Sequence, residues 1–230
     1  MKLALGAFAS VLTLTVSALA QDTVPVTVDN FTRAETDNYM AINAKDAGGL
    51  GKFHHSREPT SIDNQTVIRL NRDTLYSFGV FDLTSPVTIT LPYAGKRFMS
   101  LMVINEDHYV PLVAYDDKPH TLTERELGTR YAVAAVRTFV DPNEPKDVDE
   151  VHKLQDAIGV SQKDIGKLEL PNWDQVSLKE IRDALLVLAK HTTGFSHSFG
   201  TREQVDPIHH LIATAAGEPR RRRNRACPTP

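Results

Sequence analysis

Residues 71–77 hold the densest group of side chains in this chain that could bind a polar ligand or take part in its chemistry. They read Asn-Arg-Asp-Thr-Leu-Tyr-Ser and lead directly into an apolar, strand-like run. A polar group set against a core strand needs either several internal partners or a polar ligand. We therefore predict that Asn71, Arg72 and Tyr76 bind a ligand, with Asp73 as a catalytic candidate. The alternative is that Asp73 closes a turn and Arg72 pairs with an acidic neighbour.

Two further arginines could complete such a site. Arg97 and Arg130 each lie next to a predicted strand. Together with Arg72 they could grip an anionic group through forked hydrogen bonds. We predict that the three guanidinium groups line one hollow. The alternative is that each pairs separately with one of the many carboxylates of the chain.

Residues 107–109, Asp-His-Tyr, form a second candidate. A histidine with a near-neutral pKa could act as a general base, which makes His108 the other catalytic candidate, and Tyr109 would contact the ligand. Adjacent residues on a strand face apart, so Asp107 could orient His108 only across a turn. The alternative is a loop histidine with solvated neighbours.

The remaining motifs favour neither a metal nor a nucleophile. The pairs His54-His55 and His209-His210 lack the three or four ligands of a zinc site, and the chain has one cysteine. Residues 194–200 do not read G-x-S-x-G and do not follow a strand, so they do not form a nucleophile elbow. No phosphate loop or dinucleotide fingerprint is present. We predict no metal and no cofactor.

The elements that would position these residues are a helix, a set of strands and a final group of helices. Capping boxes at Thr32 and Ser177 and an Asp-Pro start at Asp206 predict helices over 32–46, 177–191 and 206–216, with another over 148–158. Residues 49–66 are polar and predict a long surface loop. Short β-branched runs separated by turns predict strands over 74–83, 87–91, 97–103, 109–115 and 131–140. Their close spacing favours an antiparallel sheet of about five or six strands, and hence an α+β fold.

Both ends of the chain differ from its body. Residues 1–20 have the charged start, apolar run and Ala-Leu-Ala ending of a secretory signal peptide, which predicts a periplasmic or secreted protein with no integral membrane segment after cleavage. Residues 21–217 hold 20 basic and 28 acidic side chains, a net charge of −8, which disfavours nucleic-acid binding. Residues 218–230 form a basic, proline- and arginine-rich tail that we expect to be disordered.

Several ordered motifs resemble the bacterial domain of unknown function 1254 (DUF1254). They lie at residues 71–77, 82–83, 86–87, 91–92, 95–100, 107–109, 128–131, 205–207, 210–212 and 215–217. The resemblance implies an exported protein with a mostly β N-terminal domain, and a second domain, DUF1214, that usually follows; it supplies no reaction. Here the tail departs from that pattern after Gly217. Our hypothesis is a frameshift or truncation there, with a natural basic tail as the alternative.

Two functions remain open on the sequence. The first is an exported protein that binds a small polar or anionic molecule and could hydrolyse it. The second is a non-catalytic envelope binding or assembly module whose polar residues are structural. Whether the protein is an enzyme stays undecided, and self-association into a homo-oligomer is left open, because a missing second domain would leave apolar surface exposed.

Overall fold

The computed structural model describes residues 22–59, 71–194 and 196–217 of the chain. The predicted signal peptide, the basic tail and residues 60–66 of the predicted surface loop lie outside the described residues, so these expectations stay predictions.

Two antiparallel sheets form the centre of the molecule. The larger sheet has the order β1-β2-β7-β4-β5 and the smaller one the order β6-β3-β8. The α+β prediction is confirmed, with the strands divided between two sheets. The strands are β1 (Phe53–His55), β2 (Thr74–Asp82), β3 (Val87–Thr90), β4 (Met99–Asn105), β5 (Leu112–Ala114), β6 (Pro119–Leu122), β7 (Tyr131–Phe139) and β8 (Gly159–Gln162).

Strand β7 is the middle strand of the larger sheet, and its side chains point alternately into two hydrophobic clusters. Ala132, Ala134 and Val136 pack in the cluster between the two sheets. Tyr131 and Val133 point to the opposite face, because side chains alternate along a strand. On that face they form a second cluster with residues of the first helix.

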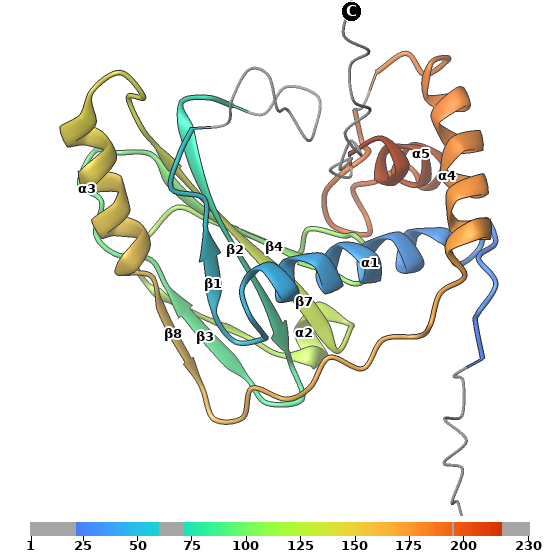
Figure 1. Cartoon of the computed structure of the whole chain (residues 1–230), viewed down its shortest axis with the longest axis horizontal. Coiled ribbons are helices and arrows are strands. Elements are labelled where there is room, and N and C mark those ends of the chain that lie inside the picture. The colour runs from blue at the N-terminus through green and yellow to red at the C-terminus, as the bar shows by residue number, and fades with distance from the viewer. Residues whose placement is uncertain (1–21, 60–70, 195, 218–230) are drawn as a thin grey trace, which may run out of the picture.

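The described residues form five helices around the sheets (Figure 1). Phe31 and Ala34 of the first helix pack with residues of the last two, while its Met40 and Ala44 pack on the sheet. The first helix therefore links the C-terminal helices to the sheet, and the third packs at the other side of the molecule (Figure 1). The helices are α1 (Phe31–Asp46), α2 (Glu124–Leu127), α3 (Pro145–Asp156), α4 (Gln175–Ala189) and α5 (Pro207–Gly217).

The predicted capping boxes are wrong at two helices. Helix α1 begins one residue before Thr32, at Phe31, whose side chain is fully buried. Helix α4 is capped by Asp174, and Ser177 Oγ instead accepts a hydrogen bond from Val26 N. Tertiary packing overrides the local pattern in both cases. The start of α5 is as predicted, since Asp206 Oδ1 accepts hydrogen bonds from the backbone of the first turn.

The sequence missed the three short strands β1, β6 and β8. Each has three or four residues and lies at the edge of its sheet. So short a segment shows too few residues for its alternation to be read, and pairing with a longer neighbour decides its conformation. Strand β1 lies within the predicted surface loop.

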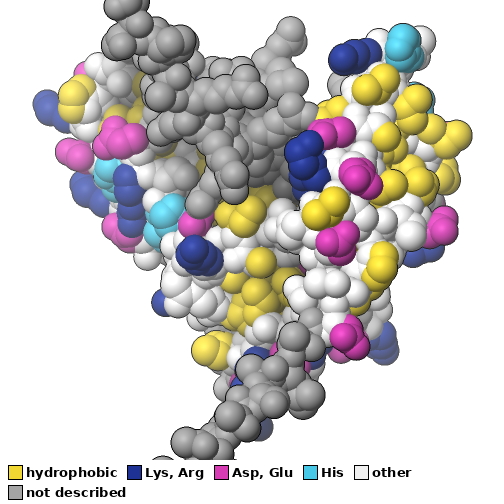
Figure 2. All heavy atoms as spheres, turned by 45° about the vertical axis from the view of Figure 1, so that its right-hand side comes forward, with side chains coloured by type: hydrophobic (Ala, Val, Ile, Leu, Met, Phe, Trp, Pro, Cys, Tyr) yellow, Lys and Arg dark blue, Asp and Glu magenta, His cyan; other side chains and the backbone are white. Residues whose placement is uncertain are grey.

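The side of the molecule formed by α4 and α5 carries exposed hydrophobic side chains, which include Val176, Val187, Leu188 and Ile208 (Figure 2). No helix within the described ranges combines the length and apolarity needed to cross a membrane.

Candidate functional site

The predicted site residues divide into two groups at opposite ends of β7. Asp82 of β2 pairs in register with Tyr131, and Thr74 with Phe139. These two pairs are eight residues apart along β7, which is about 26 Å at 3.3 Å per residue. His108, Tyr109 and Arg130 belong to the Tyr131 end; Asn71, Arg72, Asp73 and Arg97 belong to the Phe139 end. The expected single hollow with three guanidinium groups is therefore wrong, and Asp73 and His108 cannot act on one substrate atom.

Arg130 is used in an ion-pair network beside the end of β2. Its Nη2 lies 2.8 Å from Asp82 Oδ2 and its Nη1 lies 2.9 Å from Glu169 Oε2. Burial acts to raise the pKa of the Asp82 carboxyl, but hydrogen bonds from Arg130 and Thr84 outweigh it and hold the pKa below its usual value. These contacts match the alternative of separate pairing.

Arg97 makes a similar pair at the other end. Its Nη1 donates to Asp147 Oδ2 at 2.9 Å and to Phe139 O at 2.8 Å. The hydrogen bond from Arg97 lowers the pKa of Asp147 to about 2. The guanidinium group therefore ties α3 to the sheet through Asp147 and Phe139 O.

The polar segment that precedes β2 is exposed. Asn71, Arg72 and Asp73 are exposed, and Asp73 Oδ1 accepts a hydrogen bond from the hydroxyl of Thr74 at 3.1 Å. Tyr76 is half-buried. Its side chain lies on the same face of the larger sheet as α1, which packs on another part of that face. Of the four predicted residues in this segment, the structure places Tyr76 alone on that face of the larger sheet.

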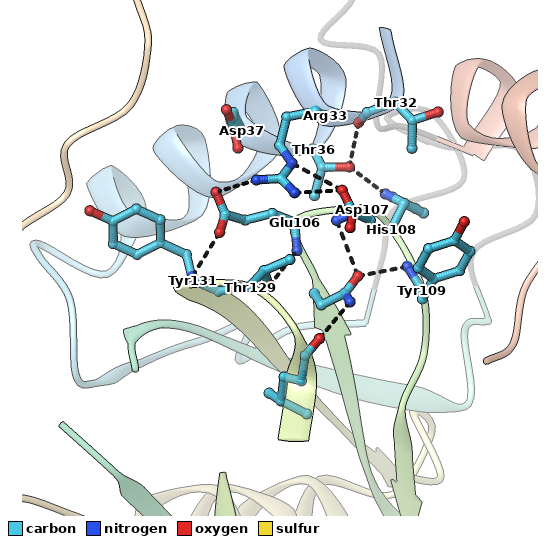
Figure 3. Close-up of polar contacts among 12 residues, drawn as sticks. Thr32, Arg33, Thr36, Asp37, Glu106, Asp107, His108, Tyr109, Thr129 and Tyr131 are labelled. Carbon is cyan, nitrogen blue, oxygen red and sulfur yellow. Dashed lines mark hydrogen bonds and ion pairs between the residues drawn. The ribbon is translucent and has the colours of Figure 1, made fainter. Parts of the chain in front are cut away.

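His108 belongs to a polar junction between α1 and the end of β4 (Figure 3). Arg33 of α1 reaches Glu106 Oε1 at 3.2 Å and also hydrogen-bonds Asp107 Oδ1. Glu106 is buried, and its Oε2 accepts a hydrogen bond from Tyr131 N at 2.9 Å. Thr36 Oγ1 lies 2.9 Å from His108 Nδ1. The junction satisfies buried charges and fixes α1 against the sheet.

The protonation state of His108 follows from these contacts. Burial, and then the nearby His210, lower the pKa of His108 to about 4, so the ring is neutral at pH 7. Thr36 Oγ1 donates its proton to Thr32 O, so it accepts from Nδ1–H of His108. The backbone φ of His108 is +62°, in the left-handed region where histidine is enriched. The turn that would allow Asp107 to orient the His108 ring is present, but the Asp107 carboxylate binds Arg33 instead.

His210 of α5 joins the same junction from the other side. Its Nδ1 lies 2.9 Å from Ser198 O and its Nε2 lies 2.9 Å from Asp107 O. The ring is 5% exposed and stacks on Tyr109 at 4.7 Å. Both ring nitrogens face backbone carbonyl oxygens, so neither points into a space where a metal could bind. Within residues 22–59, 71–194 and 196–217, no group of three histidine, cysteine or acidic side chains could hold a metal ion.

A serine and a histidine meet at hydrogen-bond distance on the other face of the sheet. His55 Nδ1 lies 2.8 Å from Ser77 Oγ, and burial followed by the Arg57 charge lowers the pKa of His55. This contact has the geometry of a nucleophile and its base. However, Ser77 is 1% exposed and its Oγ also accepts a hydrogen bond from Gln155 Nε2. The hydroxyl lacks the exposure that a substrate needs, which favours a structural contact.

One charged residue that the sequence reasoning missed stands on the face of the larger sheet. Arg137 is the only charged residue of β7, and β7 is the middle strand. Its register partners are Tyr76 on β2 and Ser100 on β4, so these three side chains share one face. The guanidinium carbon lies 5.8 Å from the centre of the Tyr76 ring and 5.9 Å from that of Phe98.

The partners of Arg137 set it apart from Arg97 and Arg130. Its Nε is buried and makes no hydrogen bond, and no carboxylate of the described chain pairs with the guanidinium group. Arg137 is half-buried, so its charge is partly removed from water without a counter-ion in the described chain, and the two flanking rings compensate only in part. The signal was available in the sequence as a single arginine directly after the apolar run Ala132 to Val136.

The comparisons with known proteins agree with this fold. The sequence pattern of the family described as "Protein of unknown function (DUF1254)" matches residues 50–126. This match confirms the resemblance to DUF1254. The matched segment includes Tyr76, Phe98 and Ser100 but ends before Arg137. The DUF1214 domain that the resemblance implies stays an expectation.

A solved structure shares the architecture. It is the crystal structure of the VPA0106 protein from Vibrio parahaemolyticus, with a TM-score of 0.58 and 13% sequence identity. The likeness covers 84% of this chain and 66% of that one, so the chain spans about two thirds of the length of that protein. At this identity the likeness shows the fold alone. No curated protein matches the chain.

Proposed function

We propose that this protein binds a small anionic molecule with an apolar or aromatic body, through Arg137 and the rings beside it. The observation that carries the proposal is the guanidinium group of Arg137, which lacks a carboxylate partner in the described chain and stands on the middle strand of the larger sheet. Binding, without a proven chemical step, is the function that these contacts favour.

The surroundings of Arg137 support this ligand class. An arginine stacked between aromatic rings keeps the N–H groups at its edge for a carboxylate or phosphate, which they bind in a forked geometry. Tyr76 and Phe98 provide the rings, and Phe78 stacks against Tyr76 at 5.9 Å. An apolar ligand body would bury against these rings, while its charge would neutralise the cation.

Among the described residues, α1 packs on a different part of the sheet from Arg137. Helix α1 packs on Val133 through Met40 and Ala44, and Arg137 lies about 13 Å further along β7. None of the hydrophobic clusters of the described residues contains Tyr76, Phe98 or Arg137.

Thermal unfolding with matched ligands tests the proposal. Benzoate should raise the melting temperature of the protein more than acetate at equal concentration, because a ligand that binds the native state stabilises it by mass action. Arg137→Gln should abolish the shift and Arg137→Lys should reduce it, since lysine keeps the charge but not the planar fork. Arg125→Gln, on an exposed arginine of α2, is the matched control and should respond like the unmodified protein.

Two results would contradict the proposal. One is a melting temperature that no carboxylate or phosphate changes while the protein stays folded. The other is an anion-induced shift that persists in Arg137→Gln, which would place the binding elsewhere.

A further inference from the structure

A small hollow lies at the edge of the larger sheet, away from the polar junction of α1. It has a volume of about 170 Å³ and is formed by the turn that precedes β4 together with the residues that follow β5. Drug-sized ligands occupy about 300–1,000 Å³, so this hollow fits a single ring-sized group.

Two tyrosines line the hollow and are largely exposed. Tyr93 is 79% exposed and Tyr115 is 68% exposed. The ring of Tyr115 is supported from one side by Phe98, with 6.0 Å between the ring centres. Each tyrosine offers an apolar ring face and a hydroxyl that can donate or accept a hydrogen bond.

Carboxylates complete the lining. Asp116 and Asp117 line the hollow beside Tyr115. Asp116 Oδ1 lies 2.8 Å from His120 Nε2 and accepts a hydrogen bond from Lys118 N at 3.2 Å, and the contact with His120 lowers the pKa of Asp116. Asp116 is thus held in place as an ionised acceptor, and Asp117 is an exposed acceptor next to it.

The charges of the hollow disfavour an anion. Among the described residues that line it, Arg97 is the one cation, and it is ion-paired with Asp147 and donates a hydrogen bond to Phe139 O. The two carboxylates would repel an anionic group. The ligand of this hollow must therefore differ from the anion proposed for Arg137.

We propose that this hollow is a second binding site, which takes one ring of a neutral saccharide. The C–H face of a sugar ring would stack on Tyr93 or Tyr115, and its hydroxyl groups would donate to the carboxylates of Asp116 and Asp117. This site is independent of the anion site. A sugar ring combines an apolar face with several donors, which is the chemistry that the lining offers.

Saturation-transfer NMR on the protein tests the site with a panel of neutral saccharides, namely glucose, galactose, N-acetylglucosamine and their disaccharides. At least one should bind, and Tyr93→Ala and Tyr115→Ala should each weaken it about tenfold, the scale of one aromatic contact. Tyr93→Phe should retain most of the affinity. Asp117→Asn should weaken binding because an amide accepts fewer hydrogen bonds than a carboxylate.

Controls separate this site from the others. Val176→Ala removes an exposed apolar side chain on α4 and should leave saccharide binding unchanged. Arg137→Gln should also leave it unchanged, so failure of the anion site and failure of this one are distinguishable. Absence of binding by every saccharide in the panel would overturn the proposal. Binding that survives both tyrosine substitutions would overturn it too, as would capture of tetramethylammonium in place of any saccharide.

Discussion

Replacement of Asp37 by asparagine should change how the stability of the protein depends on pH. Asp37 is 1% exposed; its Oδ2 accepts a hydrogen bond from Trp173 Nε1 at 2.9 Å, and its Oδ1 makes none within the described chain. Burial raises its pKa from 3.8 to about 6, with the charge of Glu106 adding to the effect and the Trp173 hydrogen bond and Arg33 opposing it.

The size of the effect follows from the two pKa values. A carboxyl that binds its proton more tightly in the folded state stabilises the fold below the unfolded pKa, and this stability is lost as the pH rises through the folded pKa. For Asp37 the window runs from about pH 4 to pH 7, and the difference of about two units corresponds to at most about 3 kcal/mol.

The asparagine side chain in Asp37→Asn is uncharged at every pH, and its amide oxygen still accepts the hydrogen bond from Trp173 Nε1. Its free energy of unfolding should exceed that of the unmodified protein at about pH 7.5, and the gap should shrink by about 1 to 2 kcal/mol at about pH 5. Urea unfolding followed by fluorescence measures this directly, because Trp173 is the one tryptophan of the chain.

Asp149→Asn, on an exposed position of α3, is the matched control and should show the same pH dependence as the unmodified protein. The other carboxylates contribute equally to Asp37→Asn and to the unmodified protein, so the difference between their pH profiles of stability comes from Asp37 alone. Equal pH dependence of Asp37→Asn and the unmodified protein would refute the reasoning, because it would mean that the Asp37 carboxyl titrates alike in the folded and unfolded chain.

Two further substitutions test the ion pairs. Gly166 has a φ of +66°, and a Cβ there would lie 2.3 Å from Asp82 Oδ2, so Gly166→Ala should destabilise the protein by about 2 kcal/mol or more. Gly128 also has a positive φ, but a Cβ there would meet open space, so Gly128→Ala is the control. If the chemical-denaturation midpoint falls equally in both variants, the clash with Asp82 is absent. Asp147→Asn removes the carboxylate that Arg97 binds and should cost about 1 to 2 kcal/mol at pH 7. The pKa of Asp147 is lowered to about 2, so this stability is present above about pH 4 and lost as the pH falls through 2. A loss of stability that is as large near pH 2 as at pH 7 in urea unfolding would contradict the assignment.

The main elements were predictable because their signals are local. The clean alternation of residues 87–91 and the β-branched run of residues 131–140 predict strands, and the structure has β3 and β7 there. Asp206 before Pro207 predicted the start of α5, since a capping carboxylate acts on the next few backbone amides. The caps of α1 and α4 were not predictable, because burial of Phe31 and the long-range use of Ser177 override the local pattern.

The composition of the candidate site was only partly predictable. Tyr76 was predicted and lies on the proposed binding face. Arg97 and Arg130 were also predicted, but they form ion pairs with carboxylates and stabilise the fold. Arg137 was missed, although a lone charge in an apolar strand was visible.

The types and order of the amino acids alone determine that this chain builds an α+β fold with antiparallel sheets, because backbone conformation responds to neighbours a few residues away. Only the tertiary structure decides which arginine lacks a carboxylate partner. Strand register brings Arg137 beside Tyr76 and Ser100 and leaves it without a carboxylate from the described chain. Charge pairing acts through space over a few ångströms, and distance along the chain says little about it.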